Sequence, residues 1–270
     1  MRFKTYFMKK SIVFLTAIML SVSSWAEPRR KKIIATGWDT LRIQPSEVLA
    51  NADKFANSGI DGINLSFSIR NKDGKTVDGS AIFSGFAIEY DDVKHFVPDF
   101  QKIAVSPGLT ESLLTVWWTP RQGQRIKWSD DSGWRLVAGN MGVMAKLAKE
   151  GGLKGLFLDW EDYSNVGQFK WIEEEDPPLK ETMKLARQRG REVGGAVFKE
   201  FPDLTFFSYW WLCCASYISS YQATEREYAL SKSVWVAFVD GMFDVMPDGV
   251  TMIDGREHYH LESFRRDFYR

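Results

Sequence analysis

Two acidic residues follow directly on an apolar stretch near the middle of the chain, in the segment GLFLDWEDYS at residues 155–164. The apolar stretch has the composition of a buried strand, and Asp159 and Glu161 stand at its end. Charged side chains are seldom left where a core strand ends unless they are paired or take part in chemistry. Residues two apart on an extended chain project to the same side, so the two carboxylates are expected to lie together.

A pair of neighbouring carboxylates suits acid–base catalysis at a glycosidic bond. Two carboxyl groups held close cannot both ionise freely, so one is expected to keep its proton near neutral pH, as a general acid must. We predict that Glu161 is this acid and that Asp159 assists it. Glu257 is the predicted partner base or nucleophile, with Asp39 and Asp254 as substitutes. The alternative is that the acids form structural salt bridges with Lys or Arg.

Aromatic and polar residues also gather at the ends of the other predicted strands. Aromatic faces suit the apolar faces of sugar rings, and each single tryptophan would also suit core packing. The clustering at strand ends favours the sugar interpretation. The predicted substrate-binding residues are Trp38, Asp39, Trp117, Trp118, Trp160, Tyr163, Tyr209, Trp210 and His258.

Strand and helix patterns alternate along the chain, which predicts an α/β fold of parallel strands with crossover helices. The predicted strands are 31–38, 61–68, 112–120, 154–160, 204–212 and 249–254. The predicted helices are 45–59, about 92–104, 134–152, 177–201, 227–246 and about 261–270. A polar loop is expected around Gly74 and Gly79.

The favoured architecture is a (β/α)8 barrel of TIM-barrel type, with a doubly wound open sheet as the alternative. No G-x-G-x-x-G turn follows the first strand, and the chemistry at the strand ends is typical of barrel enzymes. Only six strands are found, so either two were missed or the barrel is truncated after about six βα units.

The N-terminus has the pattern of a secretory signal peptide. Arg2, Lys4, Lys9 and Lys10 precede an uncharged apolar stretch, and Ser24 and Ala26 suit a cleavage site. We therefore expect residues 1–26 to be removed, giving a secreted or periplasmic protein, and residues 27–270 to form a single barrel domain that is incomplete at its C-terminus. The alternative is a membrane anchor, for which the apolar stretch is short.

The charge balance and the apolar segments of the chain limit the classes of partner that are expected. The chain has 35 basic and 35 acidic residues, and loss of the four basic residues of the signal leaves a net charge of −4. Without an extended basic run, nucleic acid is not an expected partner, and no further segment is apolar enough to predict a membrane contact after cleavage. No cofactor and no metal are predicted, although His258 and His260 have metal-ligand spacing.

Two further features are expected to be structural. The adjacent residues Cys213 and Cys214 are interpreted as small buried thiols, with a strained vicinal disulfide as the alternative. The basic segment RQRGRE at residues 187–192 is interpreted as late in a long helix, where cations complement the helix dipole.

The segment KGLFLDWE at residues 154–161 resembles the fourth-strand signature of chitinase-type glycosidases, D-G-x-D-x-D-x-E. Gly155, Asp159 and Glu161 match it, whereas Lys154 and Phe157 stand where the pattern has Asp. This resemblance implies that Glu161 is the proton donor. More broadly, the segments ATGWDT, DGINLSFS, FLDWEDYS, RQRGRE and MIDGREHYH resemble secreted bacterial (β/α)8-barrel proteins of glycoside-hydrolase type.

The leading functional hypothesis is a secreted glycoside hydrolase that acts on a polysaccharide or oligosaccharide. A second hypothesis is a non-catalytic carbohydrate-binding barrel that keeps the aromatic residues at the strand ends. A third is a hydrolase of another class, acting on a sugar ester through His258 or His260.

Overall fold

A computed structural model describes residues 31–36, 43–70, 76–78, 82–83, 85–118, 120, 125–159, 165–212 and 233–255. The chain divides into two compact units, Met1–Lys32 and Ile33–Arg270, and all the helices and strands below belong to the second. The predictions for residues 1–26, for Cys213 and Cys214, and for a helix over 261–270 lie outside the described residues.

The described residues of this unit form a sheet of six parallel strands, in the order in which they occur along the chain. They are β1 (Ile34–Ala35), β2 (Gly62–Leu65), β5 (Leu113–Trp117), β6 (Gly155–Asp159), β7 (Thr205–Ser208) and β8 (Thr251–Asp254). A doubly wound sheet reverses its strand order at a switch point. The unreversed order is instead that of consecutive βα units in a barrel, so the doubly wound alternative is not supported.

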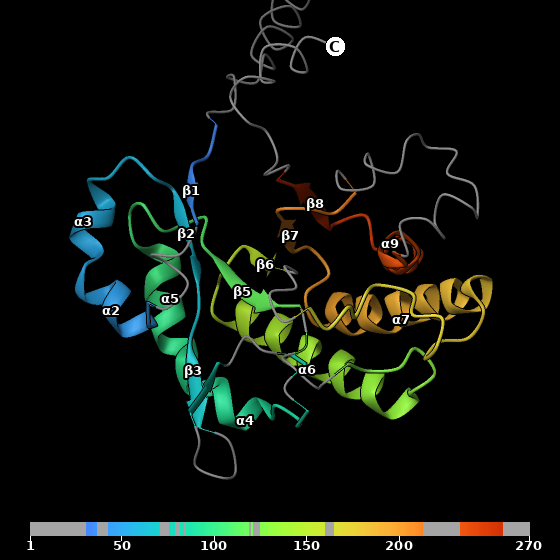
Figure 1. The fold of residues 1–270 in the computed structure, drawn as a ribbon. Coiled ribbons are helices and arrows are strands. Elements are labelled where there is room, and N and C mark those ends of the chain that lie inside the picture. The colour runs from blue at the N-terminus through green and yellow to red at the C-terminus, as the bar shows by residue number, and fades with distance from the viewer. Residues whose placement is uncertain are drawn as a thin grey trace, which may run out of the picture. The chain divides into compact units, whose positions relative to one another are not determined.

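Helices connect these strands, and α6 and α7 lie along one side of the sheet (Figure 1). The helices are α2 (Pro45–Ala50), α3 (Ala52–Ala56), α4 (Tyr90–Val93), α5 (Val97–Val105), α6 (Asp131–Glu150), α7 (Leu179–Glu200) and α9 (Trp235–Phe243), with a 3-10 turn, η1 (Lys94–Phe96), before α5. The Asp130 carboxylate caps α6 by accepting hydrogen bonds from the amides of Ser132 and Gly133, each at 3.0 Å.

The strands place alternate side chains on opposite faces of the sheet. Leu114, Val116, Leu156, Leu158 and Phe206 are all buried and pack with the helices in the main hydrophobic core. Their sequence neighbours point the other way. This second face, called the concave face below, carries Asn64, Thr115, Trp117, Phe157, Asp159 and Phe207.

A single hydrogen bond shows how strongly the sheet is curved. Thr36 follows β1 and Tyr209 follows β7, four strand positions apart in the sheet order. In a flat sheet four spacings would separate these strands by about 19 Å. The Thr36 Oγ1 and Tyr209 hydroxyl oxygens nevertheless lie 2.7 Å apart. The sheet is therefore curled so that the face opposite α6 and α7 is enclosed.

Within the described residues β1 and β8 are the two edges of the parallel sheet. Central strands β2 and β6 are buried throughout, whereas β8 alternates between exposed and half-buried residues. A curled sheet of six parallel strands is compatible with a barrel truncated after about six βα units.

A short antiparallel hairpin stands where the sequence predicted a polar loop. Its strands are β3 (Ser68–Arg70) and β4 (Thr76–Asp78). The prediction of a loop is wrong for these two segments, because the polar composition that favoured it is also compatible with short strands that pair with each other. None of the helices in the described part of the chain is long and apolar enough to cross a bilayer.

Candidate active site

Asp159 lies at the carboxyl end of β6 on the concave face. The register places it beside Trp117 of β5, and the Trp118 amide donates a 2.7 Å hydrogen bond to its backbone carbonyl. Asp159 is only 3% exposed, so this is a carboxylate almost completely removed from solvent. Removal of a carboxylate from water is costly unless neighbouring groups compensate, so a buried carboxylate is paired, hydrogen-bonded or bound to a ligand.

Tyr209 crosses the concave face above Phe157. Their rings lie 4.8 Å apart, edge to face, and the Tyr209 hydroxyl reaches the Thr36 hydroxyl. The Thr36 oxygen also accepts a 2.6 Å hydrogen bond from the side-chain amide of Asn64. A chain of hydrogen bonds thus joins the ends of β7, β1 and β2 across the inside of the curled sheet.

Two polar residues on this face, Asn64 and Thr115, were not predicted from the sequence. Both are completely buried. Asn64 Oδ1 and Thr115 Oγ1 have no hydrogen-bond partner within the described residues, and neither does the indole nitrogen of Trp117. The available signal was a single polar residue within an apolar run, as in GINL and LLTVW, which is unusual for a strand buried on both faces.

Trp118 lies in the hydrophobic core instead of on the concave face. It is completely buried, its ring stacks on Phe169 at 6.4 Å, and it meets Phe83 and Phe238 edge to face. Consecutive strand residues point to opposite faces, so Trp117 and Trp118 could not both face a ligand. Trp118 is therefore not part of the site that we propose.

Trp210 is also buried, with 7% of its surface exposed. Its ring lies 5.6 Å from that of Tyr209, and its amide donates to the Ser208 hydroxyl at 3.2 Å. It therefore supports the position of Tyr209. The remaining predicted site residues lie outside the described residues: Trp38, Asp39, Trp160, Glu161, Tyr163, Glu257 and His258.

Asp254, named above as a substitute partner carboxylate, belongs to the opposite face of the sheet. It pairs in register with Ser208, two residues beyond the pair of Phe206 and Met252, which pack with the core. Its Oδ2 accepts a 2.9 Å hydrogen bond from the Leu212 amide. Asp254 is therefore unsuited to act across the concave face from Glu161.

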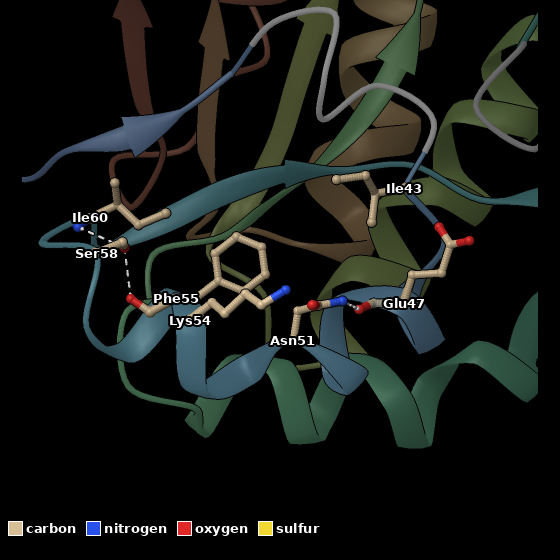
Figure 2. Close-up of a pocket in the computed structure, with 7 residues that line it drawn as sticks. All are labelled: Ile43, Glu47, Asn51, Lys54, Phe55, Ser58 and Ile60. Carbon is tan, nitrogen blue, oxygen red and sulfur yellow. Dashed lines mark hydrogen bonds between the residues drawn. The ribbon is translucent and has the colours of Figure 1, made fainter.

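A separate surface pocket lies beside α2 and α3 (Figure 2). Its lining residues are Ile43, Glu47, Asn51, Lys54, Phe55, Ser58 and Ile60. Ile60 precedes β2, so this pocket is near the amino ends of the strands, opposite the end where barrel enzymes build active sites. Ser58 and Asn51 donate their side-chain hydrogen bonds to local backbone carbonyls. We assign no function to this pocket.

The concave face combines a buried carboxylate with hydrogen-bond donors and acceptors and with the aromatic rings of Trp117, Phe157, Phe207 and Tyr209. No group of three or more His, Cys, Asp or Glu side chains within the described ranges is arranged to hold a metal ion.

In comparison with known proteins, the chain matches no protein-family model and no curated protein.

Proposed function

We propose that this protein is a secreted glycoside hydrolase with a TIM-barrel-type fold that acts on a polysaccharide or oligosaccharide. The observation that carries the proposal is the position of Asp159, a buried carboxylate at the carboxyl end of a central parallel strand, on the concave face. Glu161, two residues later, is the proposed general acid.

The surroundings of Asp159 support a carbohydrate ligand. Trp117 lies beside it in register, and Tyr209 lies over Phe157, the residue two positions before it. Aromatic rings with polar edges pack on the apolar faces of sugars, while their N–H and O–H groups bind hydroxyls.

In the proposed reaction Glu161 donates its proton to the glycosidic oxygen as the bond from that oxygen to the anomeric carbon breaks. A second carboxylate either removes a proton from the water that attacks the anomeric carbon, or attacks that carbon itself. In the second case a water molecule, deprotonated by the Glu161 carboxylate, then releases the sugar from the enzyme. Glu257 is the proposed second carboxylate. Asp159 is proposed to hold Glu161 in place and to favour its protonated form before the reaction.

The first experiment is a screen of the purified exported protein against aryl-glycosides and a polysaccharide panel. On the substrate found, Glu161→Gln is expected to lower kcat at least 100-fold, about 3 kcal/mol, because the amide cannot supply the proton. Asp159→Asn is expected to lower kcat by a smaller factor. Asp162→Asn is the matched control, since Asp162 is a neighbouring acid with no proposed role. Near-normal kcat in Glu161→Gln protein with an unchanged circular dichroism spectrum would contradict the proposal.

A second candidate function is carbohydrate binding without catalysis. One observation favours this function. Among the described strand ends of the parallel sheet, β6 alone places a carboxylate on the concave face, and Asp254 of β8 lies on the other face. The described residues therefore supply one carboxylate, whereas hydrolysis requires two. The same screen separates the two functions. A binding protein would bind a saccharide with no release of reducing ends, and Glu161→Gln would leave its affinity nearly unchanged.

A further inference from the structure

Three polar atoms on the concave face are buried without a hydrogen-bond partner among the described residues: Asn64 Oδ1, Thr115 Oγ1 and Trp117 Nε1. They come from the adjacent strands β2 and β5. Thr115 and Trp117 are two apart on one strand, so their side chains are neighbours. Trp117 is in turn beside Asp159.

Such atoms are rare in folded proteins for a physical reason. A buried polar group without a partner costs about 1–3 kcal/mol, and most buried polar groups in native structures are paired. An apolar residue of the same shape would remove this cost at Thr115, whereas at Asn64 it would also remove the hydrogen bond to Thr36. Three such groups on neighbouring positions therefore suggest a common partner that binds all of them.

The three atoms complement hydroxyl groups. Asn64 Oδ1 only accepts hydrogen bonds, Trp117 Nε1 only donates them, and the Thr115 hydroxyl does both. The hydrogen bond from Asn64 Nδ2 to Thr36 fixes the amide so that its oxygen is the atom left over. A hydroxyl both donates and accepts, so vicinal hydroxyls of one ring match this set better than an anion or a cation does.

We propose that Asn64, Thr115 and Trp117 form a hydroxyl-binding subsite that holds one ring of a saccharide directly beside Asp159. This inference rests on the proposed function only for the class of ligand. It assigns binding roles to Asn64 and Thr115.

The test measures affinity and stability together, in the Glu161→Gln background so that no ligand is consumed. The probes are soluble cello-, xylo-, manno- and chito-oligosaccharides, titrated by calorimetry. With the oligosaccharide that binds most tightly, Thr115→Val is expected to raise Kd at least tenfold while leaving the melting temperature unchanged or higher. Thr182→Val is the matched control. Thr182 is equally buried, but its hydroxyl donates to the Pro177 carbonyl at 2.7 Å, so the change should lower the melting temperature and leave Kd within twofold.

A second pair of variants tests the indole. Trp117→Phe is expected to raise Kd at least tenfold. Trp118→Phe, which removes an equally buried indole nitrogen on the core side, should leave Kd within twofold. The indole NMR cross-peak that disappears in Trp117→Phe protein is expected to shift when the oligosaccharide is added to the Glu161→Gln protein.

The outcomes separate this inference from the proposed function. If Thr115→Val and Trp117→Phe weaken binding but Glu161→Gln does not slow hydrolysis, the subsite stands and the catalytic proposal fails. If Glu161→Gln abolishes hydrolysis while Thr115→Val and Trp117→Phe bind normally, the subsite is overturned alone. Absence of binding by every oligosaccharide of the panel also overturns it.

Discussion

Arg189 shows how a single residue of the basic segment 187–192 contributes to the structure. Its side chain is 2% exposed and donates to the Trp128 carbonyl at 3.1 Å and to Glu192 at 2.8 Å, with a further ion pair to Asp131. The sequence predicted a structural role through the helix dipole. The segment is in the middle of α7, so ion pairs and hydrogen bonds, instead of the dipole, account for it.

Replacement of Arg189 by Lys is expected to lower the free energy of unfolding by about 1.5–3 kcal/mol, because an ammonium group cannot reach all three partners of the planar guanidinium. Arg191→Lys is the control on the same helix. Arg191 is 47% exposed, and its loss of one bond to Asp244 should cost no more than about 0.5 kcal/mol. Urea unfolding of both variants measures the difference, and equal effects would contradict the prediction.

Asp244 is expected to make stability depend on acid pH. A hydrogen bond from Arg187, followed by a second from Arg191, lowers the pKa of Asp244 to about 2 from its ordinary value of 3.8. A depressed pKa means that the folded protein holds the proton less tightly than the unfolded chain does. The stabilisation is therefore complete above about pH 4 and is lost as the pH falls through 2.

Melting temperatures of wild-type and Asp244→Asn protein between pH 7 and pH 2 test this dependence. The variant is expected to melt at a lower temperature at neutral pH, and the difference should shrink steadily as the pH falls from 4 to 2, where about half of the Asp244 carboxyls of the folded protein are protonated. Asp248→Asn, at an exposed position shortly after Asp244, is the control and should show no such convergence. A constant difference at all pH values would show that the carboxylate charge is not responsible.

At the scale of elements, α7 and α9 approach each other through glycine. A Cβ atom on Gly190 would lie 1.9 Å from the Phe238 carbonyl oxygen, and one on Gly241 would lie 1.9 Å from the Arg187 carbonyl oxygen. These are backbone atoms that cannot move aside independently, so the two helices could not keep this distance with larger residues.

Gly190→Ala is therefore expected to destabilise the protein by about 2 kcal/mol or more, since the helices must separate and lose packing. Gly195→Ala is a matched control on the same helix, where an added Cβ meets nothing within 4 Å. That change should be neutral or stabilise by up to about 1 kcal/mol, because alanine favours helix. Thermal unfolding distinguishes them, and a stabilising Gly190→Ala would overturn the predicted close approach.

At the scale of the whole molecule, we propose that residues 1–26 are an export signal and that the mature chain begins at Glu27. The charged start, the apolar stretch and the small residues before position 27 support this proposal. Intact-mass measurement of protein recovered from the exported fraction is expected to show loss of residues 1–26. A mass that retains them would contradict cleavage and favour an anchor.

The positions of all six parallel strands could be predicted from the sequence, because each is a short apolar run bounded by turn residues. The single helix predicted over 45–59 is in fact two short helices that meet at Asn51. The hydrophobic pattern of a sequence indicates that a helix is present more reliably than it indicates where the helix begins or ends. The candidate site was predicted only in part. Asp159 and Trp117 were named, whereas Asn64 and Thr115 were not, because their importance depends on lacking partners in three dimensions.

The sequence by itself determined the alternation of strands and helices and the placement of acids after the fourth parallel strand, since these follow from local composition and spacing. Only the tertiary structure decided that Trp117 faces the concave side while Trp118 enters the core, and that Asp254 is on the far face from Asp159. The physical reason is that strand register and sheet curvature arise from packing between segments far apart in the chain. The 2.7 Å contact of Thr36 with Tyr209, 173 residues later, exists only once that packing has formed.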